Sequence, residues 1–448
     1  MIYLGFPIGS SRSVGSSEYL SATTGTIREQ TGQMNIAIVG TGVSGLACAH
    51  LLSRAHDVTV FEADARPGGH AHTVTVELRD GSFDVDTGFL VYNERNYPGL
   101  IRLFDDLGVP TKPSDMSFSV TDEVTGLEWK GSTFDTVFAQ RRNLARPSFL
   151  RMLADIVRFN RMARGLLEDP HDAAVSLGDL LDRGRWSSQF LNWYLVPMGS
   201  SIWSADPSTF LAMPAVTFAR FFANHGLLEY GNQPSWRTVD GGSKRYVDAV
   251  LAPLGRSVRL EEPVTKITRV DDGVEIVTAR GPEHFDHLVV ATHSDQALDL
   301  LSDPSRLERE VLGAIRFQPN RATLHTDVSL LPANRRAWAS WNYHRLPDHP
   351  TEATLTYRLR SLQGVASRDE LLITLNRDDA IDPATVLRTF DYSHPVYDSA
   401  AIAAQRRQEE LNGVQRTWYC GAYWGYGFHE DGVQSARVVC RRLAGVDL

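Results

Sequence analysis

Cysteine is scarce in this chain, and several other features that would narrow its class are missing. The 448 residues contain three cysteines, Cys48, Cys420 and Cys440, which are too few and too scattered for a disulfide framework or a zinc site. No apolar run approaches the roughly 20 residues that span a bilayer, and no P-loop, HExxH, GxSxG or CxxC motif is present. The formal net charge of −9 disfavours nucleic acid as a partner. The expected class is a large cytoplasmic protein without a metal site.

The first 33 residues differ in composition from the remainder. They are rich in Ser, Gly and Thr, and they lack the basic start and the long apolar centre of a signal peptide. Met34 stands immediately before the first predicted strand. Residues 1–33 are therefore predicted to be a disordered extension or the product of an upstream mis-start, with a targeting leader as the alternative.

A dinucleotide-binding fingerprint follows directly. Residues 36–45 read IAIVGTGVSG, an apolar strand that runs into a G-x-G-x-x-G turn and then into a helix. Gly40 permits the tight turn, Gly42 lets the backbone approach a phosphate, and Gly45 lets the helix pack closely on the strand. The pattern predicts a Rossmann-type nucleotide site.

The ends of this unit predict where the dinucleotide lies. The first helical residues, Val43 and Ser44, present N–H groups and the positive end of the helix dipole to a pyrophosphate. A second predicted strand, at residues 58–61, ends at Glu62, which lies 22 positions after Gly40. A carboxylate at about 20 residues from the first glycine is placed to accept hydrogen bonds from a ribose.

The segment after the second strand indicates which dinucleotide binds. Residues 63–73 read ADARPGGHAHT and resemble the E-A-x-x-R-x-G-G-R segment of the amine oxidase, phytoene desaturase and protoporphyrinogen oxidase superfamily of FAD enzymes. The resemblance implies FAD as the cofactor, with Ala63, Gly68 and Gly69 along it. His70 stands where the family has an Arg near the pyrophosphate, so a titratable donor replaces a fixed cation.

Within that superfamily the chain most resembles one bacterial group. Its Gly-Gly-His segment with a nearby Thr-Val resembles the corresponding segment of a group of NAD/FAD-binding oxidoreductases. That group is often associated with fatty-acid cyclopropanation and related lipid modification. Residues 357–363 read YRLRSLQ, where the group has Tyr-x-x-Asn-x-Leu-Gln. Arg360 occupies the Asn position, which predicts a different specificity if that Asn orients a substrate.

Other segments of the superfamily recur along the chain. Residues 84–90, DVDTGFL, resemble the D-x-G strand and turn whose backbone passes the flavin ring. Residues 239–246, VDGGSKRY, resemble the P-x-G-G segment that leads towards the adenine side. The first match implies that Gly88, Phe89 and Leu90 contact the cofactor. In the predicted strands at residues 258–267, Val264 matches the position whose backbone contacts adenine in the superfamily.

The C-terminal segment resembles the closing motif of the superfamily. Residues 418–433 read WYCGAYWGYGFHEDGV and precede a predicted helix. In relatives the turn lays backbone N–H groups beside flavin N1 and O2, where a helix N-terminus favours negative charge. Ala422 and Tyr423 replace the family's Gly-Asp/Glu, so the ribityl carboxylate would come from Glu430 or Asp431, unless Asp431 caps the helix. The match assigns Gly421, Ala422, Glu430, Asp431, Gly432 and Val433 to the cofactor site.

Flavin-binding segments at both ends of the chain imply two interleaved domains. The predicted fold class is α/β, with a Rossmann-type, glutathione-reductase-like FAD-binding domain and an interleaved α+β substrate domain. The FAD-binding domain is assigned to residues 34–105, 231–295 and 406–448, and the substrate domain to residues 106–230 and 296–405. Large side chains in the substrate domain and its flank suit an apolar pocket or an ordinary core equally well: Trp203, Phe221, Phe222, Trp236 and Trp341.

Residues 149–166 predict an amphipathic helix in the substrate domain. Arg151 and Arg158 lie nearly opposite its apolar face, which indicates either a solvated helix over the core or a basic helix resting on anionic lipid. The apolar face comprises Phe149, Met152, Leu153, Ile156, Phe159, Ala163 and Leu166.

The predicted chemistry follows from a single nucleotide fingerprint. Without a second G-x-G-x-x-G for NAD(P)H, the electrons come from the organic substrate, by a C–H oxidation that leaves C=C or C=N. Relatives place aromatic residues over the flavin; Phe428 matches one such position, and Tyr92 or Tyr343 is a candidate for another. His429 is the candidate proton acceptor, with a helix-start histidine bonded to backbone as the alternative.

These features predict an FAD-dependent dehydrogenase or desaturase that acts on a hydrophobic substrate, namely a fatty-acyl chain or a phospholipid. Peripheral contact with the inner membrane face remains open. One alternative is a flavin-dependent isomerase or mutase without net redox change. The other is a non-catalytic lipid-binding or partner-binding protein of the same fold, which the intact Gly40, Gly42, Gly45 and Glu62 disfavour.

Overall fold

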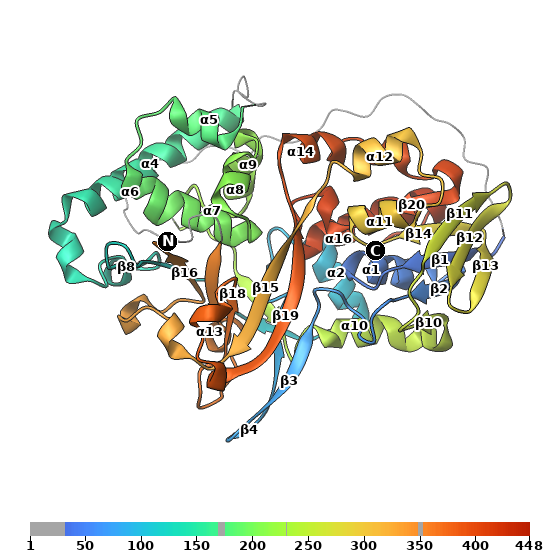
Figure 1. Cartoon of the computed structure of the whole chain (residues 1–448), viewed down its shortest axis with the longest axis horizontal. Coiled ribbons are helices and arrows are strands. Elements are labelled where there is room, and N and C mark those ends of the chain that lie inside the picture. Colours follow the sequence, from blue (N-terminus) through green and yellow to red (C-terminus); the bar gives the residue numbers. More distant parts are fainter. Residues whose placement is uncertain (1–31, 169–174, 230, 348–352) are drawn as a thin grey trace.

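The computed structural model describes residues 32–168, 175–229, 231–347 and 353–448. Of the predicted N-terminal extension, residues 1–31 lie outside this description. The chain forms two halves that lie side by side, one built on a parallel sheet and the other on a larger, mostly antiparallel sheet (Figure 1). Among the described helices, none is both long enough and apolar enough to cross a bilayer.

The first half is organised by a five-stranded parallel sheet in the order β10-β2-β1-β14-β20. Its central strand is apolar and buried from Ile36 to Val39, as expected for a strand that is covered on both faces, here by helices and by a second sheet. The strands are β1 (Asn35–Val39), β2 (Asp57–Phe61), β10 (Val258–Arg259), β14 (His287–Val290) and β20 (Thr417–Tyr419).

Helices cover one face of the parallel sheet and a small antiparallel sheet covers the other. Their apolar side chains form two clusters, one on each side of β1. The helices on the first face are α1 (Val43–Leu52), α2 (Pro98–Leu107), α10 (Lys244–Leu251) and α16 (His429–Ala444). The covering sheet comprises β11 (Lys266–Val270), β12 (Gly273–Thr278) and β13 (Gly281–Phe285), with α11 (Ser294–Leu300) and α12 (Arg306–Leu312) beside it.

The second half is built on a seven-stranded sheet in the order β19-β15-β18-β17-β16-β7-β8. All its neighbours are antiparallel except the pair β16 and β7. The strands are β7 (Phe118–Asp122), β8 (Leu127–Lys130), β15 (Phe317–His325), β16 (Trp341–Arg345), β17 (Thr354–Arg358), β18 (Leu372–Leu375) and β19 (Val386–Pro395). This arrangement confirms the predicted α/β fold class with an α+β second half.

A layer of helices packs on this sheet (Figure 1). The amphipathic helix predicted at 149–166 is α4, which begins at Pro147 and whose predicted apolar face is buried except for the partly buried Leu166. The helices of the layer are α3 (Phe134–Val137), α4 (Pro147–Glu168), α5 (Leu177–Asp182), α6 (Ser188–Phe190), α7 (Val196–Trp203), α8 (Pro207–Leu211) and α9 (Ala215–Asn224).

A glutamine of the second half holds the strand that leads into the predicted flavin segment. Gln363 ends α13 (Leu359–Gln363), and its Oε1 accepts the backbone N–H of Asp86 at 2.9 Å while its Nε2 donates to the Asp86 carbonyl at 3.0 Å. Asp86 ends β4 (Gly81–Asp86), which pairs with β3 (Thr73–Leu78). Its carboxylate accepts the N–H of Ser243 at 2.8 and 3.0 Å. The two halves therefore share this buried junction, directly before Gly88.

We expect Gln363→Leu to destabilise the protein by about 2–4 kcal/mol, because it leaves a buried N–H and a buried C=O of Asp86 without partners. Urea unfolding followed by fluorescence measures this loss. Gln140→Leu is the matched control, since the Gln140 amide bonds to the exposed Gly126 carbonyl at 2.9 Å and should cost about 0.5 kcal/mol or less. Equal losses in the two variants would contradict the role of Gln363.

Candidate functional site

One cavity of about 1090 Å³ runs between the two halves and is lined by both. Its lining includes Glu62 and Val264 from the first half and Trp341 and Tyr357 from the large sheet of the second half. Predicted cofactor residues that line it are Gly40, Gly42, Val43, Ser44, Glu62, Ala63, Gly69, His70, Gly88, Phe89, Leu90, Val264, Gly421 and Ala422. The fold therefore brings together residues from the beginning, the middle and the end of the chain.

The glycine turn leaves an open face at the start of α1. Gly40 has φ +102°, and a Cβ there would lie 2.8 Å from the Ala291 carbonyl oxygen. At Gly45 a Cβ would lie 2.0 Å from the carbonyl oxygen of Gly40. At Gly42, by contrast, a Cβ would have no atom within 4 Å, and no side chain caps the helix that begins at Val43. The exposed N–H groups make this an anion site.

Glu62 is anchored beside that turn. Its Oε2 accepts the backbone N–H of Thr41 at 3.0 Å and also the Thr41 hydroxyl, while Oε1 accepts the N–H of Asp64 at 3.1 Å. The N–H of Gly68 donates to Thr41 Oγ1 at 2.9 Å, so Gly68 supports the loop and does not itself line the cavity. The carboxylate is thus held rigidly where a ribose is predicted.

His70 lines the cavity as a neutral ring. Its burial lowers the pKa well below the ordinary value, and the neighbouring His394 acts in the same direction. Among the described residues, no partner reaches its buried Nε2. The fixed cation near this loop is Arg66, whose guanidinium donates to the carbonyls of Pro67, Gly69 and Ala71. Sequence reasoning did not assign Arg66 to the site, although the motif contains it.

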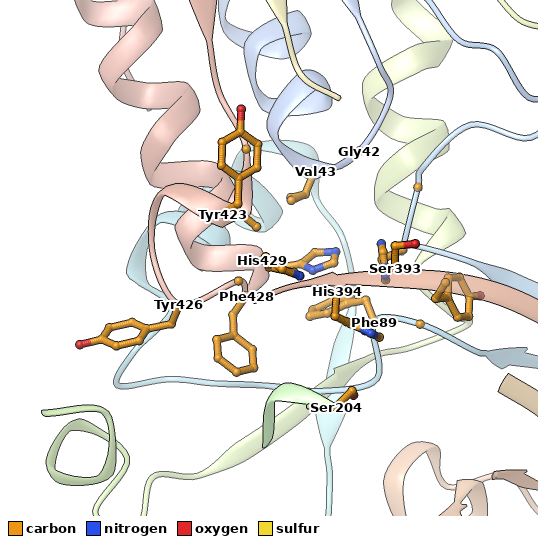
Figure 2. A pocket seen from close by; sticks show the side chains of 18 of the residues that line it. Gly42, Val43, Phe89, Ser204, Ser393, His394, Tyr423, Tyr426, Phe428 and His429 are labelled. Atoms are coloured by element: carbon orange, nitrogen blue, oxygen red, sulfur yellow. The ribbon is translucent and has the colours of Figure 1, made fainter. Parts of the chain in front are cut away.

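The site fits FAD by several independent features. The open face of Gly42 and the uncapped start of α1 suit a pyrophosphate, the anchored Glu62 suits a ribose, and His70, whose buried Nε2 has no partner among the described residues, lines the same cavity. At the far end of this groove, Phe89 lies parallel to His429, with ring centroids 3.7 Å apart and planes at 16° (Figure 2).

The comparison with known families now decides the identity of this site. The family model for flavin containing amine oxidoreductases matches residues 43–326, more than half of the chain. The chain belongs to this family. Membership of this family of flavin-containing oxidoreductases implies FAD as the cofactor, and the lining beside Gly42 and Glu62 is compatible with it.

Curated relatives match over part of their length. A protein of Mycobacterium tuberculosis described as a flavin-containing monoamine oxidase, AofH, is 28% identical over 285 residues, which cover 60% of this chain and 59% of that protein. The L-amino acid dehydrogenase of a Synechocystis strain is 26% identical over 268 residues, 57% of this chain and 55% of that protein. The aligned part is thus less than two thirds of either relative.

Solved structures show the same fold. Cyclohexylamine oxidase from Brevibacterium oxydans matches with a TM-score of 0.67 at 17% identity, covering 92% of this chain and 100% of that one. A fatty acid isomerase from P. acnes that produces CLA matches with a TM-score of 0.64 at 16% identity, covering 92% and 99%.

Two carboxylates in the first turn of α16 do not have the cofactor-binding role that the sequence predicted. Glu430 does not line the cavity; its carboxylate accepts the N–H groups of Gly99 at 3.0 Å and Leu100 at 2.8 Å, at the start of α2. Asp431 caps its own helix, with Oδ2 accepting the N–H of Phe428 at 2.9 Å, and burial raises its pKa to about 7. Neither carboxylate is free to hold a ribityl chain.

Two further residues of that turn also pack helices together. A Cβ at Gly432 would lie 2.6 Å from Cγ1 of Val43, and Val433 is buried in the core beside α1. Both residues lie outside the cavity lining. Their role in the flavoprotein is the close approach of α16 to α1.

Of the two catalytic candidates, only His429 lines the cavity. His429 lines the cavity, but burial lowers its pKa to about 3, and its Nε2 lies 3.1 Å from the Tyr246 hydroxyl. A ring with this pKa is a poor proton acceptor at ordinary pH. Tyr343 lies in the core of the second half on β16 and does not line the cavity. The second aromatic position predicted for Tyr343 is therefore wrong.

The end of the cavity beyond Phe428 is mostly apolar. The sequence did not decide whether five large side chains line a pocket or fill the core. Four of them line the cavity: Trp203, Phe221, Trp236 and Trp341. The fifth, Phe222, is buried in the core. Arg360 does not line the cavity and pairs instead with Glu370 at 3.1 Å. Lining residues that sequence reasoning missed are Met116, Phe118, Met198, Ile202, Leu227, Tyr357, Tyr392, Ser393, His394 and Tyr426.

We expect Gly42→Ala to lower FAD affinity at least about tenfold without loss of stability, because its φ of −59° and ψ of 171° suit alanine and its Cβ would enter only the groove. Gly45→Ala should instead destabilise the fold itself, since the Cβ would strike the Gly40 carbonyl. FAD titration and urea unfolding separate the two effects. Unchanged affinity in Gly42→Ala would place the pyrophosphate elsewhere.

We expect His429 to make the holoprotein less stable in acid. The unfolded chain takes up the imidazole proton near pH 6.5, whereas the folded ring does so only at about 3, so stability falls as pH decreases through this window. His429→Phe keeps the ring stack on Phe89 and should recover about 3 kcal/mol relative to wild type between about pH 7 and pH 4. Urea unfolding at both pH values measures this.

His284→Phe is the control for that experiment, because His284 is exposed and bonds to Asp272 at 3.2 Å. An identical pH dependence in His429→Phe and wild type would show that His429 is not a buried neutral ring.

Proposed function

We propose that this flavoprotein oxidises a C–H bond of a fatty-acyl chain or phospholipid, as a dehydrogenase or desaturase of the bacterial lipid-associated group. The observation that carries the proposal is the apolar end of the cavity, bounded by Met198, Ile202 and Trp203 on α7 and by Trp341 and Tyr357 on the sheet. Apolar side chains of this size favour an alkyl chain over a charged molecule.

The carboxylates near this end support an uncharged reacting group. Asp115 and Asp391 line the cavity but are exposed, and Asp115 accepts the Ser340 hydroxyl at 2.9 Å. An ammonium group drawn into the apolar end would need a buried negative partner. Among the described lining residues on the substrate side, no buried carboxylate offers one.

In the proposed reaction the lining residues bind and position the substrate. Two adjacent carbons of the chain would lose a hydride and a proton to leave a C=C bond; FAD, when bound, would supply the acceptor of the hydride, and the proton would pass to water. The aromatic and aliphatic lining would hold the chain and exclude water, and Figure 2 shows Phe428 between Val43 and Ser204, the residue that follows α7. The neutral His429 and His70 add no charge that would trap an ionised substrate.

An exposed corner of the helical layer supports access from a membrane. Phe134, Leu144, Leu150 and Val157 are 56%, 47%, 43% and 47% exposed, on α3, the following turn and α4. Residues 134–168 carry seven Arg against three acidic residues, in a chain of net charge −9. Exposed apolar side chains and an excess of Arg along α4 are typical of a helix that rests on anionic lipid.

The position of this corner relative to the cavity also fits the proposal. Gly131 and Ser132, which immediately precede α3, line the cavity. α4 lies at the outer edge of the helical layer, away from the parallel sheet (Figure 1). An acyl chain that enters beside α3 would reach the apolar end before the flavin end.

We expect anaerobic addition of phospholipid vesicles to bleach the visible flavin band of the purified protein. Ile202→Asp should slow bleaching at least about tenfold by placing a charge in the apolar end, whereas Val414→Asp, at a position 51% exposed and outside the cavity lining, should not. Leu150→Asp with Val157→Asp should slow bleaching by anionic vesicles but not by a detergent-dispersed acyl chain, because only the vesicles need the corner.

Other outcomes identify the alternatives. Lipid conversion without bleaching would indicate an isomerase or mutase, and bleaching by primary amines but by no acyl lipid would overturn the proposed substrate. Val270→Asp, at a position 39% exposed on β11, is the control for an added surface charge.

A further inference from the structure

Two asparagines meet a histidine where β15 and β19 cross the cavity. Asn376 follows β18 with φ +54°, and its Oδ1 accepts the backbone N–H of Arg321 at 2.9 Å. Because a backbone N–H only donates, this bond determines which way the Asn376 amide points. The Nδ2 of Asn376 therefore faces Asn320 and donates to its Oδ1 at 2.8 Å. The 3.3 Å contact from the same Nδ2 to the Ala353 carbonyl agrees with this orientation.

The orientation of Asn320 in turn determines the protonation of His394. With Oδ1 engaged, the Nδ2 of Asn320 lies 2.9 Å from Nδ1 of His394 and donates to it. Nδ1 is then an acceptor without a proton, so the neutral ring carries its hydrogen on Nε2. Burial keeps the ring neutral by lowering its pKa to about 4. The backbone N–H of Arg321 thus determines the tautomer of His394, because it orients the Asn376 amide, which in turn orients the Asn320 amide.

His394 presents that N–H to the flavin end of the cavity. A dinucleotide bound at Glu62 and the start of α1 would extend along the cavity past His70, and the His394 ring lies 5.3 Å from the His70 ring. Figure 2 shows His394 in the part of the cavity that Phe89, Phe428 and His429 also line. Among the described residues, none bonds to Nε2 of His394.

We propose that Asn376 and Asn320 lock His394 as the Nε2–H tautomer, and that this N–H donates a hydrogen bond to an acceptor atom on the edge of the flavin ring. His394 is the contacting residue, and the two asparagines are positioning residues. A fixed neutral donor stabilises the ring as it gains electron density, so it raises the reduction potential of the flavin. The proposal rests on the flavin and is independent of the acyl substrate.

The tautomer can be measured in the unmodified holoprotein. With ¹⁵N-labelled histidine, the ring nitrogen shifts of His394 should show a protonated Nε2 and an unprotonated Nδ1; His394→Phe assigns the signal. A protonated Nδ1 in the wild-type holoprotein would overturn the lock. This measurement requires no variant of Asn320 to fold.

A near-isosteric change should invert the tautomer. In Asn320→Asp the oxygen that faces Nδ1 can only accept, so at about pH 8.5, above the ordinary imidazole pKa, the ring proton should move to Nδ1 and Nε2 should become an acceptor. Gln318→Glu is the matched control: it adds the same charge on the same face of β15, opposite His394 in the strand pair, but the Gln318 side chain bonds to the Ser204 carbonyl and not to the imidazole.

The flavin potential is the functional readout. At a fixed potential set by a redox dye, the ratio of reduced to oxidised flavin should fall about tenfold in His394→Phe, as expected for the loss of one hydrogen bond to an electron-rich ring. In Asn320→Asp the ratio of reduced to oxidised flavin should fall by as much or more, and in Gln318→Glu it should fall by less. An unchanged ratio in His394→Phe would show that the N–H does not contact the flavin. No lipid is present, so failure here is separate from failure of the substrate assignment.

Discussion

The site depends on the close contact between the N-terminal ends of α1 and α16. A Cβ at Gly45 would strike the Gly40 carbonyl at 2.0 Å, and a Cβ at Gly432 would strike Val43 at 2.6 Å. The first contact packs α1 against its own glycine turn, and the second brings α16, near the end of the described chain, against α1 beneath the groove. Without them the pyrophosphate turn and the closing motif would not line a common cavity.

Burial, more than charge, sets the electrostatics of the groove. His70, His394 and His429 all have pKa values lowered by burial and stay neutral, while the nearby Arg66 is engaged with backbone carbonyls. The groups that are available to bind an anion are therefore the backbone N–H groups at the start of α1. The flavin end receives neutral donors whose direction is fixed by neighbouring amides, as at His394.

The second half contributes to the site in two ways. Gln363 holds the strand before Gly88 through the backbone of Asp86, and β19 carries Tyr392, Ser393 and His394 into the cavity. Because β19 pairs with β15 along nearly its full length, the position of His394 is tied to the large sheet. The flavin segment and the apolar end are thus parts of one packed structure, and a change in the large sheet is expected to reach both.

The sequence by itself determined the nucleotide end of the site. Gly40, Gly42, Gly45 and Glu62 act within one strand–turn–helix–strand unit, so local spacing contains the information that places them. The apolar face of α4 was predictable for the same reason, since helical periodicity is local. Tertiary structure decided the rest: Glu430 turned to the start of α2, Asp431 capped its helix and Tyr343 was buried in the core. His394 reached the cavity through partners on β15 and after β18, which lie 74 and 18 residues before it in the chain. Such contacts depend on strand pairing between distant segments, and no spacing within one element records them.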